Sequence, residues 1–171
     1  MLVPRMATRD ADKIAACRGG MAGNNGDSER MTTTRAVTRG ARRLLRDLGF
    51  AVLDEVTLPD GRRADLLGLS PGGVLRIVEV KSCREDFRVD AKWRHYRGFC
   101  DHFCFAVAEN FDPALLPADA GLIVADGHGG LLLRDSPASP LAPMRRRAMH
   151  VRFGVVAARR YGILAFNDPA D

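Results

Sequence analysis

The sequence RADLLGLSPGGVLRIVEVK, residues 63–81, has the pattern of two β-strands joined by a tight turn. Both arms are rich in Leu, Ile and Val, and the Ser-Pro-Gly-Gly between them is typical of a turn. If the turn is centred on Gly72, Asp65 faces Glu79, and directly facing Cβ atoms lie about 4.5–5.5 Å apart. The stretch therefore predicts an antiparallel hairpin with two acids opposite each other.

Side-chain alternation gathers these acids on one face of the hairpin. Successive side chains of a strand point to opposite faces, so residues two apart lie together. The shared face is apolar in the middle and carries two carboxylates and an amine at one end. Its members are Asp65, Leu67 and Leu69 from the first strand, and Leu75, Ile77, Glu79 and Lys81 from the second.

The polar end of this face indicates a site for a divalent cation. Asp65 and Glu79 repel each other and are costly to desolvate among Leu and Ile side chains. Mg²⁺ or Mn²⁺ would resolve that conflict, because both ions prefer oxygen ligands and can activate a water beside a phosphate. Lys81 is placed to orient the water or hold the phosphate. The alternative is an ion pair between Lys81 and one acid, which leaves the other acid unexplained.

The stretch TTTRAVTRGARRLLRDLGF, residues 32–50, predicts a helix before the hairpin. A Thr within residues 32–34 is suited to cap its start, and Gly49 to end it. Helical spacing puts the apolar side chains on one face, which comprises Val37, Ala41, Leu44, Leu45 and Leu48. A second stripe consists of Arg35, Arg39, Arg42 and Arg46. This stripe is either a solvated face or a ridge that contacts phosphates.

The remaining elements complete an α/β arrangement. Residues 1–31 are rich in Gly, Asn and charge without apolar periodicity, which predicts a disordered tail before one ordered domain, residues 32–171. Ser82 and Glu85 fit a capping box at the start of a second helix. The predicted strands span 50–58, 63–69, 74–81 and 102–108, a later hairpin turns at 127–130, and the further helices span 84–97 and 144–165. This order predicts a mixed central sheet flanked by helices.

Composition narrows the functional classes. A net charge of +5 over 171 residues favours a polyanionic partner. The sequence shows neither an apolar run of about 18 residues, as a membrane span needs, nor a secretory signal. The four cysteines lack CxxC spacing, and buried free thiols are a simpler interpretation than a zinc site around Cys100, His102 and Cys104. We therefore expect a cytoplasmic protein.

Asp65 followed by Glu79-Val80-Lys81 on the next strand, in a helix–β–β–β–helix–β order, resembles the PD-(D/E)xK phosphodiesterase superfamily. Restriction endonucleases and Holliday-junction resolvases belong to that superfamily. A longer match is more specific. The strings TRGARRLLRDLGFAVLDEVTLPDGRRADLLGL and IVEVKSCREDFRVDAKWRHYRGFCDHFCFAV are similar to the MmcB family of bacterial DNA repair proteins. The resemblance implies a PD-(D/E)xK core, a role in DNA repair, and DNA and other repair proteins as partners.

The same resemblance implies roles for individual residues. Asp65 and Glu79 would bind Mg²⁺ or Mn²⁺ with the Val80 carbonyl as a third ligand, and Lys81 would be the water-orienting base. The superfamily's Pro before the Asp is Ala in this chain. Many resolvase-like members carry a Glu in the first helix, where this chain has Arg, and Glu55 is the nearest replacement. Glu55 is alternatively a solvent-facing strand residue.

Candidate DNA contacts surround this site. They are Arg35, Arg39, Arg42, Arg46 and Arg63, together with Lys92 and Trp93. Phosphate contacts would hold the DNA backbone without reading bases. Trp93 either stacks on an unpaired base or packs in the core. Asp86 and Asp90 are either rim residues of the site or charges on a helix surface.

Three functions compete at this point. The leading one is a metal-dependent DNA endonuclease that acts in repair. The second is a nuclease-like module that binds damaged or branched DNA, or a repair partner, without cutting it. The third is an RNA-processing endonuclease, which would favour substrates with 2′-hydroxyls. Cutting both strands of a duplex would favour a homodimer.

Overall fold

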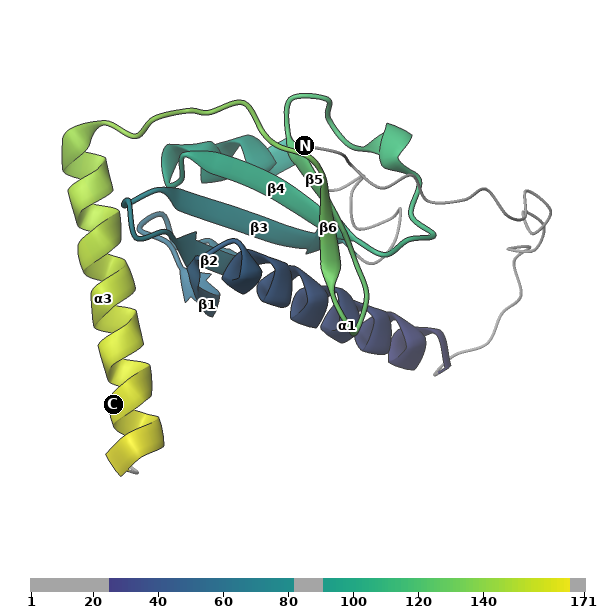
Figure 1. The fold of residues 1–171 in the computed structure, drawn as a ribbon, viewed down its shortest axis with the longest axis horizontal. Coiled ribbons are helices and arrows are strands. Elements are labelled where there is room, and N and C mark those ends of the chain that lie inside the picture. The colour runs from purple at the N-terminus through teal and green to yellow at the C-terminus, as the bar shows by residue number, and fades with distance from the viewer. Residues whose placement is uncertain (1–24, 82–90, 167–171) are drawn as a thin grey trace.

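The computed structural model describes residues 25–81 and 91–166, and the side chains of residues 28–81 and 93–166. Helices lie against a mixed sheet (Figure 1). In chain order the elements are α1 (Asn25–Asp47), β1 (Ala51–Thr57), β2 (Arg63–Leu69), β3 (Leu75–Lys81), η1 (Ala91–Gly98), β4 (His102–Val107), η2 (Pro113–Leu115), β5 (Gly121–Ala125), β6 (Gly130–Arg134) and α3 (Pro143–Phe166). The elements η1 and η2 are 3-10 helices.

The sheet of the described residues has six strands in the order β1-β2-β3-β4-β5-β6. The pairs β1–β2, β2–β3 and β5–β6 are antiparallel, whereas β3–β4 and β4–β5 are parallel. In the β2–β3 hairpin, Leu69 pairs with Leu75 and Leu67 with Ile77. The register predicted from a turn centred on Gly72 is therefore confirmed, and so is the mixed sheet.

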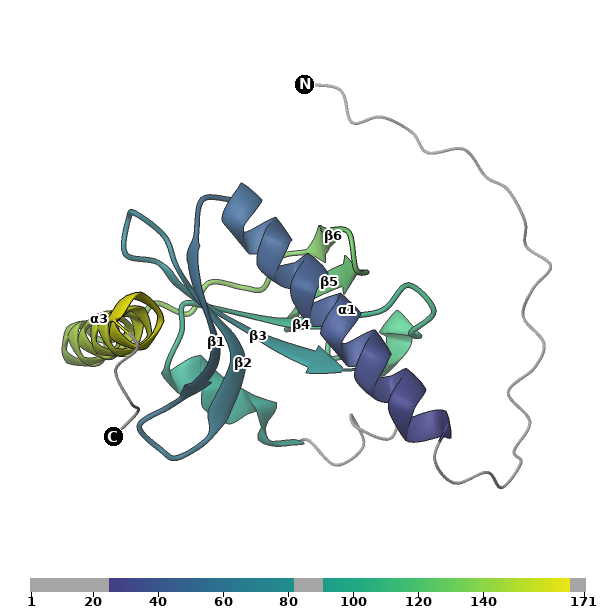
Figure 2. The same ribbon diagram turned by 90° about the horizontal axis from the view of Figure 1, so that it is seen from below.

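The two faces of the sheet bury separate apolar cores. α1 crosses one face (Figure 2), and the core beneath it includes Val37, Ala41, Leu45, Leu66 and Val78. The core on the opposite face includes Trp93, Phe103 and Phe105, with Met149 and Phe153 from α3. Strand β3 lies between the two cores and is buried along its whole length. Its apolar residues are those expected of a strand covered on both faces, and its charged residues Arg76, Glu79 and Lys81 are buried as well.

The helix α1 ends as predicted but begins earlier. Gly49 has φ +85°, and its N–H and that of Phe50 bond the carbonyls of Arg46 and Leu45, which is a Schellman cap. The start lies at Asn25 rather than within residues 32–34. The threonine hydroxyls there donate to carbonyls four residues earlier instead of capping a helix start. Residues 25–31, which the sequence assigned to a tail, are therefore helical.

Two other predictions need correction. Leu48 belongs to the apolar stripe predicted for the first helix, yet it is 49% exposed and lies in the turn after α1 has ended. Residues 91–98 form a 3-10 helix rather than the end of an α-helix. The predicted capping box at Ser82 and Glu85 lies outside the described residues. The later hairpin and the last helix are confirmed, with bounds within two residues of those predicted.

Gly40 brings the α1 backbone directly onto the turn between β5 and β6. A Cβ atom at this position would lie 2.2 Å from the carbonyl oxygens of both Asp126 and Gly129. The side chain of Arg43, on the next turn of the helix, also bonds the carbonyl of His128 in the same turn, at 3.2 Å. Only glycine permits this approach, so α1 packs closely against the sheet at the turn between β5 and β6.

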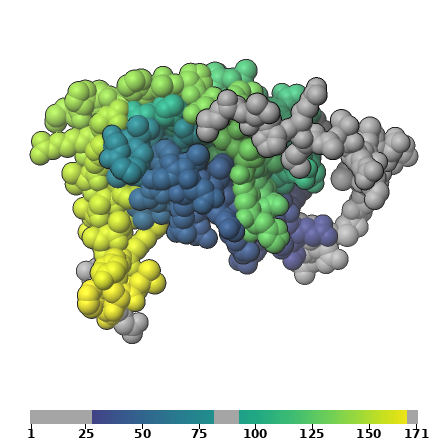
Figure 3. All heavy atoms as spheres, in the orientation of Figure 1, coloured from purple at the N-terminus to yellow at the C-terminus, as the bar shows by residue number. Residues whose placement is uncertain are grey.

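The last helix, α3, lies beside the edge strand β1 and forms one flank of the molecule (Figure 1, Figure 3). Met149 and Phe153 are its two buried side chains. Near its start, Arg146 forms a two-pronged ion pair with buried Asp101, with Nη2–Oδ1 at 2.5 Å and Nη1–Oδ2 at 2.9 Å. In the described part of the chain, no helix combines the length and apolar character that a membrane crossing requires.

Candidate functional site

The site begins where the β2–β3 ladder opens. The regular pairs end at Leu66–Val78, and beyond them the Val80 N–H donates to Oδ2 of Asp65 at 2.8 Å. In an antiparallel ladder this N–H would normally reach a backbone carbonyl of the neighbouring strand. The Asp65 carboxylate has taken that carbonyl's place. It is therefore fixed by the sheet backbone instead of being free in solvent.

Glu79 and Lys81 lie on the adjacent strand, with both side chains buried. Lys81 Nζ lies 3.3 Å from Glu79 Oε1, and the two residues are 7% and 9% exposed. The predicted apolar middle of this face is confirmed, because Leu67, Leu75 and Ile77 belong to one core cluster. Buried charges of this kind are expensive to desolvate and add little net stability. Their presence inside β3 therefore favours a functional interpretation.

Asp65 is electrostatically coupled to the surrounding charges. Burial raises the pKa of Asp65 above its ordinary value, and the nearby charge of Glu55 adds to that rise. The Val80 N–H, Lys81 and Arg63 act in the opposite direction without reversing it. The structure thus brings together the acid and the lysine that the hairpin register predicted, and places Glu55 near them.

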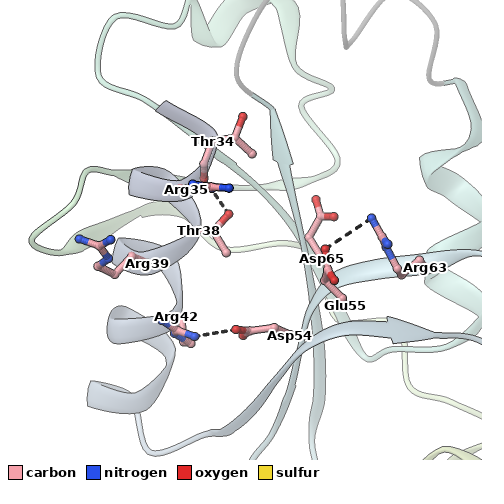
Figure 4. A pocket seen from close by; sticks show the side chains of 9 residues that line it. All are labelled: Thr34, Arg35, Thr38, Arg39, Arg42, Asp54, Glu55, Arg63 and Asp65. Atoms are coloured by element: carbon pink, nitrogen blue, oxygen red, sulfur yellow. Dashed lines mark hydrogen bonds and ion pairs between the residues drawn. The ribbon is translucent and has the colours of Figure 1, made fainter. Parts of the chain in front are cut away.

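A cavity with a volume of about 520 Å³ opens between α1 and the strands β1 and β2 (Figure 4). Its α1 wall consists of Thr34, Arg35, Thr38, Arg39 and Arg42. The strand wall consists of Asp54, Glu55, Arg63 and Asp65. Glu79 and Lys81 are not among the lining residues, so Asp65 and Glu55 are the carboxylates of the predicted catalytic set that face this cavity.

The arginine stripe predicted on α1 divides into three kinds of residue. Arg42 pairs with Asp54 at 2.6 Å across the cavity (Figure 4). Arg35 and Arg39 are exposed at its wall, and neither forms an ion pair within the described residues. Arg46 is exposed and lies outside the lining set. Arg35 and Arg39 therefore give this wall positive charge that no ion pair within the described residues neutralises, which suits an anionic ligand.

Glu55 has an unusual backbone. Its φ is +47°, which makes it the one described non-glycine residue with positive φ. The flanking pairs Asp54–Leu66 and Val56–Ala64 place it directly across from Asp65. Its side chain is 64% exposed and lies 3.5 Å from Arg63. No sequence signal announced this conformation, because a Glu within a strand gives no reason to expect positive φ.

Of the two DNA contacts predicted on the second helix, Trp93 is buried in the core and the Lys92 side chain is not described. Trp93 is 2% exposed and stacks on Phe103 with ring centroids 5.4 Å apart. Its ring therefore packs in the core, which is one of the two interpretations that the sequence allowed. It offers no face to a base. The side chain of Lys92 lies outside the described residues, as do Asp86 and Asp90.

The oxygen donors where the β2–β3 ladder opens are the Asp65 carboxylate and the Val80 carbonyl, with the Glu79 carboxylate on the adjacent strand. The N–H and C=O of a strand residue point to the same side, so the Val80 carbonyl faces β2, as its N–H does. Within the described residues, no group of three or more His, Cys, Asp and Glu side chains could hold a metal ion. Mg²⁺ usually binds through one or two carboxylates, with waters and substrate phosphates completing its ligands. The carboxylates of Asp65 and Glu79 and the carbonyl of Val80 are oxygen donors of the kind that such an ion binds.

Fold and site together define a mixed α/β protein with a buried acid–lysine cluster next to a basic cavity. The family model described as DNA repair protein MmcB-like matches residues 22–168. The chain therefore belongs to the MmcB-like family of DNA repair proteins. It is also similar to the solved structure of SPO1766, a protein of unknown function from Silicibacter pomeroyi, with 37% identity and a TM-score of 0.77 over 81% of this chain and 95% of that one. The comparison with curated proteins finds no match.

Proposed function

We propose that this protein hydrolyses DNA phosphodiester bonds with the help of a divalent cation, on a PD-(D/E)xK core. The observation that carries the proposal is the position of Asp65. Its half-buried carboxylate lies where two strands separate, opposite the adjacent strand that supplies the buried side chains of Glu79 and Lys81. A protein gains little stability from burying such charges, so chemistry is the simplest reason to keep them. Membership of a DNA repair family supports DNA as the substrate.

Each residue has a distinct role in this proposal. Asp65, Glu79 and the Val80 carbonyl would hold Mg²⁺ or Mn²⁺. When bound, such an ion polarises the phosphate and lowers the pKa of a coordinated water. The Val80 N–H keeps the Asp65 carboxylate in one orientation. Lys81 Nζ donates a hydrogen bond to the attacking water, and its charge favours the ionised form of Asp65.

The basic wall of the cavity would bind the DNA backbone. Arg35 and Arg39 lie on successive turns of α1 and are lining residues of the cavity, with the Arg39 guanidinium directed away from the strand wall (Figure 4). Such contacts are to phosphates and carry no base information. Binding should therefore be insensitive to sequence and should weaken steeply as salt is added.

A second function is favoured by the chemistry of α1. The helix wall of the cavity carries arginines and threonines and no carboxylate. Glu79 already forms an ion pair with Lys81. Both features suit a module that recognises branched or damaged DNA without cutting it. Such a module would bind DNA equally well with and without a divalent cation.

Cleavage of a panel of labelled substrates tests the two functions. The panel contains single-stranded, duplex, nicked, flapped and four-way DNAs and matched RNAs, each with Mg²⁺, Mn²⁺ or EDTA. Asp65→Asn and Lys81→Ala are compared with the wild type and with Asp60→Asn. Asp60 is a matched control, because it pairs with Arg62 in the β1–β2 turn and does not line the cavity.

The nuclease proposal expects metal-dependent products that fall by about 10²–10⁴-fold in Lys81→Ala and stay unchanged in Asp60→Asn. Asp65→Asn should remove both cleavage and cation dependence. Tight binding with no product under any metal would refute the nuclease and support the binding module. Preference for the RNA forms would support the RNA-processing alternative.

A further inference from the structure

The backbone at Glu55 is held in a conformation that an L-residue avoids. A φ of +47° places it in the left-handed region, which costs about 1–2 kcal/mol for a residue other than glycine. Such strain persists only where the surrounding structure enforces it. The residues on either side have regular pairs with β2. The strain is therefore confined to the one β1 residue that faces Asp65.

The peptide groups on both sides of the Glu55 Cα atom accept hydrogen bonds from a residue near the far end of the chain. Arg160 of α3 donates from Nη1 to the carbonyl of Asp54 at 2.5 Å, and from Nη2 to the carbonyl of Glu55 at 3.1 Å. These two carbonyls belong to the peptide planes before and after the Glu55 Cα atom. Their orientations set φ and ψ of that residue. A planar guanidinium fork can fix both planes together, which a point charge cannot.

The two hydrogen bonds from Arg160 affect the lining of the cavity. Glu55 and Asp65 both line it and lie next to each other (Figure 4). The charge of Glu55 is close enough to raise the pKa of Asp65. A carboxylate at this position adds negative charge beside the donors proposed for the cation. Regular strand geometry at Glu55 would turn the side chain to a different direction, since φ determines where Cβ points.

We propose that Arg160 is a positioning residue that holds the Glu55 carboxylate beside Asp65 and thereby raises the affinity of this site for a divalent cation. The helix α3 then controls the site without contributing a ligand. This inference rests on the proposed function, because it assumes that the cation binds at Asp65.

A double-mutant cycle in Mn²⁺ binding tests the proposal on the full chain, with calorimetry as the readout. The variants are Arg160→Gln, Glu55→Gln and the pair together. Each single change should weaken Mn²⁺ binding by about tenfold or more, as removal of outer-shell partners typically does. The double variant should bind no more weakly than Glu55→Gln alone, because Arg160 acts only through Glu55.

Arg152→Gln is the matched control. Arg152 lies on the same helix and donates from Nε to the carbonyl of Thr57 on the same strand at 2.5 Å. It therefore ties α3 to β1 without touching the peptide planes of Glu55. Its replacement should leave Mn²⁺ affinity unchanged. Thermal melting of each variant confirms that the chain is folded, and the amide coupling constant of Glu55 shows whether its φ has changed sign.

The possible results distinguish the positioning role of Arg160 from the proposed cation site at Asp65. If Asp65→Asn removes Mn²⁺ binding and Arg160→Gln binds as the wild type does, the positioning role is wrong and the metal site stands. Equal losses in the Arg160 and Arg152 variants would also overturn it, since general loosening of α3 would then explain both. If Asp65→Asn binds as the wild type does, or the wild type binds no Mn²⁺, the metal site fails and the inference fails with it.

Discussion

The strain at Glu55 can be measured by comparing glycine and alanine at the same position. At an ordinary strand position, a protein with glycine is less stable than one with alanine by about 0.5–1 kcal/mol, because glycine loses more backbone entropy on folding. At positive φ, the left-handed backbone conformation costs an alanine about 1–2 kcal/mol of folding free energy, and it costs a glycine nothing comparable. The φ of +47° therefore reverses the order at this position. We expect Glu55→Gly to be more stable than Glu55→Ala by about 0.5–1 kcal/mol.

Thr57 supplies the control, because it is exposed on the same strand and has a regular pair with Arg63. There Thr57→Gly should be less stable than Thr57→Ala by about 0.5–1 kcal/mol. Urea denaturation of the four variants measures these differences, and melting temperatures should move by about 2–4 °C per kcal/mol. The same glycine–alanine order at both positions would refute the reasoning. It would mean that the Glu55 backbone is unstrained in solution.

Two further predictions concern packing and acid stability. Gly40→Ala should lose about 1–3 kcal/mol in urea denaturation, because the new Cβ would lie 2.2 Å from two backbone oxygens that cannot swing away. Gly154→Ala, with open space around its Cβ on α3, should instead gain about 1 kcal/mol, and a loss there would contradict the argument from local packing. Burial alone would raise the pKa of Asp101, but hydrogen bonds from Arg146 and two backbone N–H groups outweigh it and hold the pKa below its ordinary value. The stability that Asp101 contributes is therefore complete above pH about 4 and lost as the pH falls through its folded pKa. Asp101→Asn should cost about 1.5–3 kcal/mol at pH 7 and progressively less in acid, whereas a difference that is constant with pH would contradict this account.

The hairpin at the centre of the sheet was predictable because its determinants are local. The turn sequence around Gly72 and the alternation of apolar side chains fix the register without help from the rest of the chain. That register alone placed Asp65 across from the strand that carries Glu79 and Lys81. The same local reasoning identified Gly49 as the end of α1, since a left-handed cap follows from glycine itself.

Features that depend on distant contacts were not predictable. The conformation of Glu55 is set by Arg160, which lies 105 residues later in the chain. Trp93 packs on Phe103 in the core, as the favoured interpretation of the sequence held, although the sequence also left a base-stacking position open. The Thr32–Thr34 run is a typical cap sequence, yet these hydroxyls bond within a helix that continues upstream. For Glu55 and Trp93 the deciding contacts are distant in the sequence, whereas the threonine hydroxyls bond locally to carbonyls four residues earlier.

The seating of Gly40 on the β5–β6 turn has a mechanical consequence. With no side chain between them, the backbone of α1 at Gly40 packs directly against the carbonyls of Asp126 and Gly129. Arg35, Arg39 and Arg42, which line the cavity, lie on this closely packed helix. The opposite wall, β1, is an edge strand that pairs on one side alone and rests against α3 on the other. A displacement of β1 relative to α1 would change the width of the cavity, so the contact between β1 and α3 bears on the space that a ligand can occupy.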